Sequence, residues 1–258
     1  MNSFKTKARL LLVTAFLYGC KTPKYLTNKV PNDMEVYLLI GQSNMAGRAI
    51  IEPQDSDSLE HVFLFTGEKG NIWNKAVNPL NTYSTVRKKL SMQKLGPGYA
   101  FAKAMIKANP NKNIGLVVNA KGGTSIEEWA PNGTLYQQAV IRTSKALKNG
   151  VLKGVLWHQG ESNTAHYNTY MPKLITLIKA IRNDFNLPNL PFVVGQLSPD
   201  KPERINFNKM LLELPKSIIH TAVVKTDSTS TIDKTHFDSA SQRLLGRRYA
   251  EEMLKLLD

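Results

Sequence analysis

The feature that most constrains the fold is a regular alternation between short apolar runs and longer stretches with helical spacing. The apolar runs occupy residues 35–40, 62–65, 114–118, 154–157, 192–194 and 218–224. Helical spacing of apolar residues follows in 98–108, 135–147, 167–185, 204–214 and 239–257. Strands that alternate with helices are joined by right-handed crossovers and form a sheet covered on both faces. The sequence therefore predicts a three-layer α/β/α sandwich with a central, mainly parallel sheet.

One such domain is predicted, from residue 35 to residue 258. The composition, 42% hydrophobic and 21% charged, is typical of a globular protein and excludes a disordered or disulfide-scaffold chain. No internal repeat, low-complexity tract or change of composition divides the chain. The formal charge of +14 comes from Lys and Arg residues scattered along the chain, with no basic helix and no Cys/His finger spacing. We therefore expect a solvated basic surface and no nucleic-acid partner.

The N-terminus has the pattern of a secretory signal. Three cationic residues precede an uncharged run at 10–18, which is too short to span a bilayer and ends at Gly19-Cys20. Residues 17–20 resemble the bacterial lipobox, whose cysteine is diacylated and becomes the mature N-terminus. The resemblance implies a signal peptide over residues 1–19, lipidation of Cys20 and a lipid anchor in the bacterial cell envelope. The alternative is a buried N-terminal helix with Cys20 in the core.

Residues 20–34 are predicted to be a tether between this anchor and the domain. They lack periodicity and contain two prolines. The folded part would then hold no disulfide, because Cys20 is the only cysteine in the chain.

Polar residues follow the predicted strands at their carboxyl ends, where open α/β sheets bind ligands. The block GQSNMAGR, residues 41–48, places Ser43 on a tight strand-to-helix turn, which exposes its hydroxyl and offers backbone N–H groups to an oxyanion. A serine in such a position is otherwise an N-cap. In residues 119–129 the pair Gly122-Gly123 brings bare N–H groups close to a ligand, or makes an ordinary turn.

Two further blocks complete the candidate site. Residues 157–163, WHQGESN, are a run of mostly polar residues directly after an apolar strand, where buried polar groups need partners. In residues 233–238, DKTHFD, Asp233 precedes His236 by three positions and can orient its imidazole from the same loop. A serine activated by a histidine that a carboxylate orients is the usual arrangement for acyl transfer.

In this order the four blocks resemble the SGNH/GDSL hydrolase superfamily. Within it they are similar to the carbohydrate-esterase branch with sialate O-acetylesterases and family 6 acetylxylan esterases, over residues 35–255. The resemblance implies the α/β/α fold and removal of acetyl groups from sugar hydroxyls without a metal or cofactor. By position it implies that Ser43 is the nucleophile, His236 the general base and Asp233 its orienting carboxylate.

The resemblance also implies an oxyanion hole. Its donors would be the Ser43 N–H, the Gly123 N–H and the Gln159 side-chain amide, with the choice between Gly122 and Gly123 open. Other residues of the blocks are expected to bind substrate or support the site: Gln42, Asn44, Arg48, Trp129 and Glu161. Asp227 is the reserve candidate for the acid of the triad.

His158 is predicted to pack beneath the site, because neighbouring residues on a strand point to opposite faces and Gln159 points toward the site. Asp238 is predicted to sit at the start of the last helix, where the dipole favours its charge.

Three functions follow from these patterns. The first is a lipid-anchored esterase that removes O-acetyl groups from xylan, sialic acid or a related glycan through an acetyl-enzyme. The second is an esterase or lipase of the same superfamily that acts on a non-carbohydrate ester. The third is a glycan-binding lipoprotein that has lost the chemistry. Ser43, Asp233 and His236 are all present, which favours an enzyme. The sugar and the position of its acetyl group stay open.

Overall fold

A seven-stranded sheet forms the centre of the molecule. The computed structural model describes residues 30–69 and 71–258, so the predicted signal peptide, Cys20 and the tether as far as residue 29 lie outside the described residues. The strands are β1 (Met34–Gly41), β2 (Val62–Glu68), β3 (Asn71–Lys75), β4 (Ile114–Val118), β5 (Gly150–His158), β6 (Phe192–Gly195) and β7 (Thr221–Val224). Their order in the sheet is β3-β2-β4-β1-β5-β6-β7. All neighbouring strands are parallel except β2 and β3.

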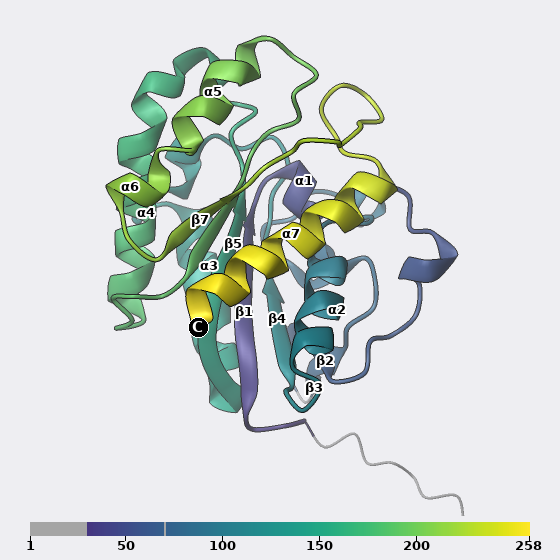
Figure 1. Ribbon diagram of the computed structural model, residues 1–258. Helices are drawn as coiled ribbons and strands as arrows, with labels where there is room; N and C mark the ends of the chain where they lie inside the picture. Colours follow the sequence, from purple (N-terminus) through teal and green to yellow (C-terminus); the bar gives the residue numbers. More distant parts are fainter. Residues whose placement is uncertain (1–29, 70) are drawn as a thin grey trace, which may run out of the picture.

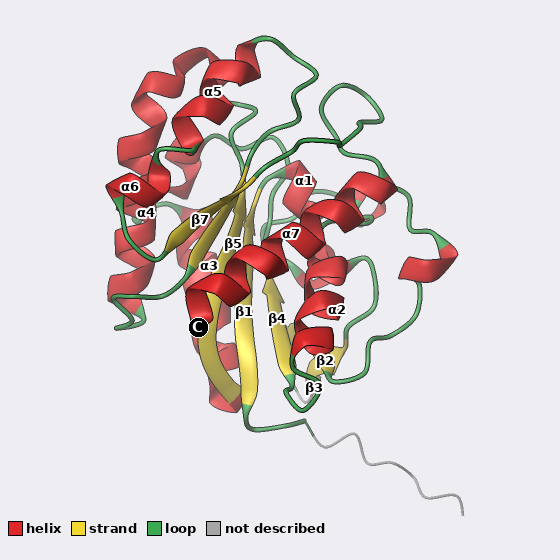
Figure 2. Ribbon diagram, in the orientation of Figure 1, coloured by secondary structure: helices red, strands yellow, loops and turns green. Residues whose placement is uncertain are grey.

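Helices cover both faces of this sheet (Figures 1 and 2). They are α1 (Ser43–Ala46), α2 (Gly98–Ala108), α3 (Thr134–Ala146), α4 (Tyr170–Asp184), α5 (Glu203–Leu211), α6 (Leu214–Ser217) and α7 (Ser239–Leu257). Helices α2 and α7 pack on one face, and α3, α4 and α5 pack on the other. Successive residues of β1 alternate between the two cores, with Tyr37 on the α2 and α7 side and Leu38 on the other. The predicted α/β/α sandwich with a mainly parallel sheet is confirmed.

Three elements differ from their predicted form. Strand β3 was not predicted, because it is the antiparallel edge strand and its only apolar residues, Ile72 and Trp73, are flanked by polar ones. The predicted helix at 204–214 is divided into α5 and α6, since Pro215 has no N–H to bond to the carbonyl of Leu211. The predicted strand at 218–224 begins only at Thr221, after His220, whose φ of 53° is outside the β region.

The folded domain begins before the predicted boundary at residue 35. Met34 is the first residue of β1 and is buried, and Val30 packs against the core. Asn149 Nδ2 donates to Asn32 Oδ1 at 2.8 Å, and Asn113 Nδ2 donates to Asp33 Oδ1 at 3.2 Å. Residues 30–34 therefore lie against the domain. In the described part of the chain, no helix is long and apolar enough to cross a membrane.

Candidate active site

The turn after β1 brings Ser43 to the carboxyl edge of the sheet. Gly41 has a φ of +133°, and a Cβ at this position would lie 2.2 Å from the carbonyl oxygen of His158 on β5. Only glycine fits this close approach. Gln42 N donates to the same carbonyl at 2.8 Å, after which the chain turns into α1. Ser43 is thereby placed, only 6% exposed, in a cavity of about 380 Å³.

Ser43, His236 and Asp233 form a continuous hydrogen-bonded chain. His236 Nε2 lies 3.0 Å from Ser43 Oγ, and His236 Nδ1 lies 2.6 Å from Asp233 Oδ2. An ionised carboxylate only accepts hydrogen bonds, so Nδ1 carries the ring proton and Nε2 accepts from the serine hydroxyl. The three residues that the sequence predicted to act together are thus in the order that acyl transfer requires.

The loop of Asp233 and His236 is a compact turn held by the carboxylate itself. Asp233 Oδ1 accepts the backbone N–H groups of Thr235 at 3.0 Å and His236 at 2.7 Å, across Lys234, whose φ is 63°. Burial raises the pKa of Asp233, but the hydrogen bonds from the His236 side chain and these two N–H groups outweigh it, so the pKa lies below its usual value. Asp227, the reserve candidate, is exposed and contacts Arg248 through its backbone carbonyl.

Asn44 connects the turn that carries Ser43 to the loop that carries His236. Its Nδ2 donates to Thr235 O at 3.0 Å, and its Oδ1 accepts the N–H of Phe237 at 3.1 Å. The same Nδ2 donates to Glu161 Oε1 at 2.7 Å. Asn44 is almost completely buried and does not line the cavity at Ser43, so it supports the site rather than binding substrate.

Arg204, on α5, holds the same loop from the other side. Its Nη1 donates to Lys234 O at 2.8 Å and contacts Ser198 Oγ, and its Nη2 donates to Thr235 Oγ1 at 3.0 Å. The guanidinium group is buried and also lines the cavity. Arg204 was not predicted to belong to the site, because a cation in an amphipathic helix is usually exposed, and only the tertiary packing buries this one.

The structure leaves the predicted backbone donors of the oxyanion hole available, but not the predicted side-chain donor. Gly122 and Gly123 both line the cavity with Ser43. Within residues 30–69 and 71–258, the backbone N–H groups of these three residues donate to no protein acceptor and remain free to bind an oxyanion. A Cβ added at Gly122 would lie 3.4 Å from Ser43 Cβ, so this glycine packs directly against the serine.

Gln159 corrects the prediction for the third donor. Its Nε2 already lies near three acceptors, Gln42 Oε1 at 3.2 Å, Thr124 O at 2.9 Å and Asn163 Oδ1 at 2.9 Å. Its Oε1 accepts from Tyr170 OH at 2.8 Å, and the side chain is completely buried outside the cavity. An amide has two N–H bonds, and both are used. Gln159 therefore ties the segments around the site together and is not an available oxyanion donor.

Of the two roles expected for Trp129, binding substrate or supporting the site, the structure is consistent only with the second. It is completely buried, packs edge-on against Trp157 with ring centroids 5.3 Å apart, and donates from Nε1 to Thr124 Oγ1 at 3.1 Å. Its polar atom is satisfied inside the core, which is the usual arrangement for a buried indole. Trp129 supports the glycine segment from below and cannot stack on a ligand.

His158 packs beneath the site as predicted. Its Nδ1 lies 3.0 Å from Tyr249 OH, whose own proton goes to Trp157 O at 2.8 Å, so the histidine donates from Nδ1. Burial lowers the pKa of His158 to about 3, which keeps the ring neutral. Asp238 caps α7 as predicted, with its side chain accepting the Ser241 N–H at 2.8 Å.

Glu161 faces the cavity beside His236 and carries a carboxylate oxygen with no partner. Its Oε1 accepts from Asn44, whereas Oε2 is buried and receives no hydrogen bond from the described residues. Burial raises the pKa of Glu161 above its usual value, although hydrogen bonds from its own backbone and Asn44, and the charges of Arg204 and His236, act in the opposite direction.

Cations dominate the rim of the cavity. Arg48, expected to bind substrate or support the site, places Nη2 against Gly122 and donates from Nη1 to the carbonyl oxygens of Gly47 and Met92. Two lysines that were not predicted to belong to the site, Lys88 and Lys201, also line the cavity. No sequence motif marks them, since they come from a loop and from the segment before α5. Among the residues that the structure describes, no cluster of His, Cys, Asp and Glu suits a metal ion.

The comparison with protein families decides the class of this protein. Residues 33–255 match the family described as carbohydrate esterase, sialic acid-specific acetylesterase. The chain belongs to this family. It is therefore a carboxylic ester hydrolase whose substrates are acetylated carbohydrates. The resemblance of the four sequence blocks to the carbohydrate-esterase branch is confirmed.

Relatives support this assignment. A probable carbohydrate esterase of Arabidopsis thaliana is 34% identical over 180 residues, which are 62% of this chain and 67% of the relative. The solved structure of that Arabidopsis protein superposes with a TM-score of 0.77 at 30% identity, covering 87% of this esterase and 98% of that chain. NanS, at 17% identity and a TM-score of 0.66, covers 87% of this esterase and 98% of its own chain, and shows the same fold.

Proposed function

We propose that this esterase removes O-acetyl groups from a glycan through an acetyl-enzyme formed on Ser43. The observation that carries the proposal is the pair of hydrogen bonds that joins Ser43 Oγ, His236 and Asp233 at 3.0 Å and 2.6 Å. A serine hydroxyl is a weak nucleophile at its ordinary pKa, so it needs a neutral imidazole within hydrogen-bond reach to take its proton. His236 is in that position.

The reaction then proceeds in two halves. Ser43 Oγ attacks the acetyl carbonyl while His236 Nε2 takes the hydroxyl proton, and the same proton passes to the departing sugar oxygen. In the second half, water attacks the acetyl-enzyme while His236 takes its proton, and His236 passes this proton to Ser43 Oγ as the bond to the acetyl group breaks and acetate leaves. Asp233 stabilises the imidazolium form and holds the ring in the tautomer that leaves Nε2 free to accept.

The negative charge of each tetrahedral intermediate falls to backbone N–H groups. Ser43 supplies one, and the glycine pair Gly122-Gly123 supplies a second. Each such donor contributes a factor of roughly 10² to 10³ in rate in other acyl-transfer enzymes. Because Gln159 is engaged elsewhere, the hole rests on two donors from rigid turns.

The charge of the cavity supports an acidic sugar as the preferred substrate. Arg48, Lys88 and Lys201 all line a cavity of about 380 Å³, which lies within the roughly 300–1,000 Å³ range of small-molecule sites. The carboxylate of Glu161 faces this cavity but already binds Asn44. An O-acetylated sialic acid, or an acetylated xylose next to a glucuronate, would place its carboxylate among these cations.

The test is acetate release from native glycans. We expect acetate from an O-acetylated sialoglycan or glucuronoxylan at a higher kcat/KM than from a neutral acetylated xylan, and none from either with Ser43→Ala. A chromogenic series separates the alternatives, because preference for butyrate or longer esters over acetate would indicate a lipase. No turnover of any ester by the folded protein would indicate a glycan-binding lipoprotein and contradict the proposal.

We also propose that this esterase is a lipoprotein of a bacterial envelope. The basic residues at 5–9, the apolar run at 10–18 and Cys20 support this location. In a bacterial host Cys20→Ser should release the enzyme from the membrane fraction or leave it unprocessed, because an acyl anchor derives its affinity from buried methylene groups. An unmodified mature mass for the parent protein would contradict the anchor.

A further inference from the structure

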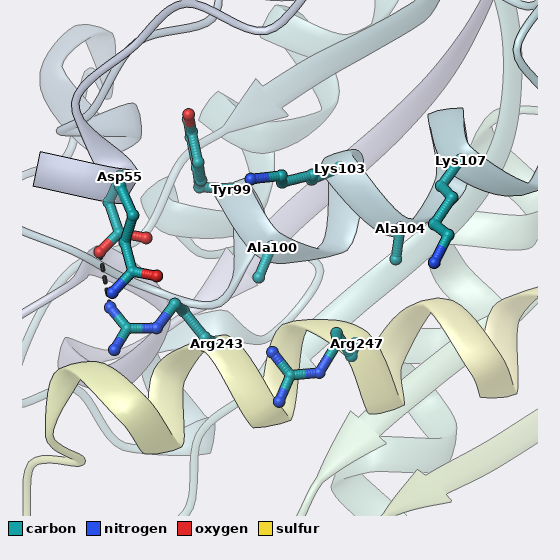
Figure 3. Close-up of a pocket in the computed structure, with 9 residues that line it drawn as sticks. Asp55, Tyr99, Ala100, Lys103, Ala104, Lys107, Arg243 and Arg247 are labelled. Carbon is teal, nitrogen blue, oxygen red and sulfur yellow. Dashed lines mark hydrogen bonds and ion pairs between the residues drawn. The ribbon is translucent and has the colours of Figure 1, made fainter.

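A second hollow lies between α2 and α7, away from Ser43 (Figure 3). It has a volume of about 260 Å³ and shares no lining residue with the active-site cavity. Lys103 and Lys107 from α2 line it, together with Arg243 and Arg247 from α7. Residues four apart share one face of a helix, so each helix presents two cations to the same space. Figure 3 shows the two small side chains of α2, Ala100 and Ala104, between these four residues.

The packing of the two helices creates this hollow. At Gly246 the helices come so close that a Cβ would lie 2.3 Å from Pro97 O and 2.7 Å from Ala100 Cβ. Farther along α2 the side chain that faces α7 is only the methyl group of Ala104, which leaves the space unfilled. The floor of the hollow is therefore apolar, and its rim is charged.

The charges around the hollow are not balanced. One carboxylate, that of Asp55, also lines the hollow, but it is paired with Arg243 at 2.8 Å, which pairs with Glu52 at 2.8 Å as well. Lys103, Lys107 and Arg247 form no ion pair or hydrogen bond with any of the residues described. Three like charges that face one space repel one another, and an anion in that space would relieve the repulsion.

We propose that this hollow is a non-catalytic binding site for a carboxylate-bearing sugar of an acidic glycan, which rests on the carbohydrate substrate proposed above. Its volume is below the roughly 300–1,000 Å³ of most small-molecule sites, so it holds one ring-sized group. The methyl groups of Ala100 and Ala104 suit the apolar face of a pyranose, and Lys103 and Arg247, which line the same hollow, would bind its carboxylate.

The shape of the site favours a glycan over a membrane surface. Anionic lipid headgroups bind cations that project from an open surface, whereas these four cations line one hollow with the methyl groups of Ala100 and Ala104 between them. Helix α7 also links the hollow to the catalytic region. Gln242 Nε2 donates to Asn44 O at 3.3 Å, and the next residue, Arg243, lines the hollow.

A glycan held at the hollow would gain a second attachment to the enzyme. Binding at two points on one chain raises the effective concentration of acetyl groups near Ser43 without changing the chemistry. We therefore expect the site to lower KM for long acidic polymers and to leave the hydrolysis of small acetyl esters unchanged.

The experiment measures binding without catalysis. Full-length protein with Ser43→Ala is titrated with deacetylated glucuronoxylan and with the same polymer after reduction of its carboxyl groups. The test variant adds Lys103→Glu and Arg247→Glu. The control adds Lys145→Glu and Lys179→Glu, which make the same charge change on α3 and α4, across the sheet; both lysines are exposed. Thermal unfolding of both variants confirms that they fold.

We expect the acidic polymer to bind more tightly than the reduced one, and the test variant to lose about tenfold in affinity, since like charges at a binding site are strongly unfavourable. The control should lose much less. Equal losses in the two variants, or equal binding of the two polymers, would overturn the proposal. So would loss of binding to phosphatidylglycerol vesicles with unchanged polymer affinity, which would make the hollow a membrane contact.

The esterase assignment is tested separately. The same charge variants with Ser43 intact should hydrolyse p-nitrophenyl acetate at the parent rate. If polymer binding shows the expected pattern but no glycan releases acetate, the binding site at the hollow is supported and the proposed function is wrong. If acetate is released but polymer binding does not depend on Lys103 and Arg247, the proposed function is supported and the binding site at the hollow is wrong.

Discussion

The side chain of Asn44 contacts the backbone on both sides of His236. It donates to Thr235 O at 3.0 Å and accepts from Phe237 N at 3.1 Å. Because Asn44 directly follows Ser43, one buried amide sets the position of the histidine relative to the serine. The 3.0 Å contact between Ser43 Oγ and His236 Nε2 therefore depends on the hydrogen bonds of Asn44 to Thr235 and Phe237, which lie far from it in the sequence.

Asn44→Ala should therefore lower kcat more than it changes KM. The substitution leaves the Thr235 carbonyl and the Phe237 N–H without their partner, which costs about 1–3 kcal/mol of stability. Steady-state kinetics and urea unfolding give the two quantities. Asn189→Ala, at an exposed position, is the control. A folded Asn44→Ala enzyme with the parent kcat would show that the loop holds His236 without this amide.

Ser43→Ala and His236→Ala should each remove nearly all esterase activity and leave the domain folded. The double variant should be little worse than either single one, because residues of a triad act as a unit. Asp233→Asn should be severe and Asp227→Asn mild, since only Asp233 contacts His236. Hydrolysis of p-nitrophenyl acetate and circular dichroism check these outcomes. The reverse order of the two aspartates would move the acid role to Asp227.

Arg204→Lys should lower kcat by about 10- to 100-fold with little change in KM. Lysine keeps the charge but cannot reach Lys234 O and Thr235 Oγ1 together, so the catalytic loop loses its fixed position. Lys201→Ala, by contrast, should raise KM for an acidic glycan and leave kcat unchanged. An Arg204→Lys enzyme with raised KM and normal kcat would make Arg204 a substrate-binding residue instead.

Gln159→Ala should affect stability more than catalysis. It removes donors to Gln42, Thr124 and Asn163, and the buried acceptors left behind cost about 1–3 kcal/mol. The measurement is kcat together with the free energy of unfolding. A fall in kcat of about 10² or more with unchanged stability would return the amide to the oxyanion hole.

His158 should make the protein less stable at acid pH. Its pKa is about 3 in the fold and about 6.5 in an unfolded chain, so between these values only the unfolded state binds the proton. Stability is then complete above pH 6.5 and falls by about 1.4 kcal/mol per unit as the pH drops toward 3. In His158→Gln the free energy of unfolding should fall less steeply over this range. Parallel curves for the two proteins would contradict the buried neutral ring.

Much of the fold could be predicted because its signals are local. Parallel strands buried on both faces are continuous apolar runs, and the helices between them show the spacing of one buried face. Strand β3 was missed because an antiparallel edge strand needs no such run. The end of α5 was missed because Pro215 takes its effect four residues earlier, at Leu211.

The candidate site, like the fold, has parts that local sequence signals predict and parts that they do not. The order of the four polar blocks and the spacing of Asp233 and His236 are features of the chain, and they predict a serine, a base and a carboxylate at one edge of the sheet. Because they stand within those blocks, Gln159 was predicted to donate to the oxyanion, and Trp129 was expected to bind substrate or support the site. The structure turns both into the protein, where their polar atoms find other partners.

The sequence by itself determined the class of fold and the residues of the hydrogen-bonded chain at Ser43, because strand ends, tight turns and a three-residue spacing are local properties. Only the tertiary structure decided which polar side chains are free to act. Arg204 and Asn44 are remote from His236 in the sequence, yet their hydrogen bonds hold its loop. The partners of a buried polar group come from whichever segments pack against it, and a linear pattern does not contain that information.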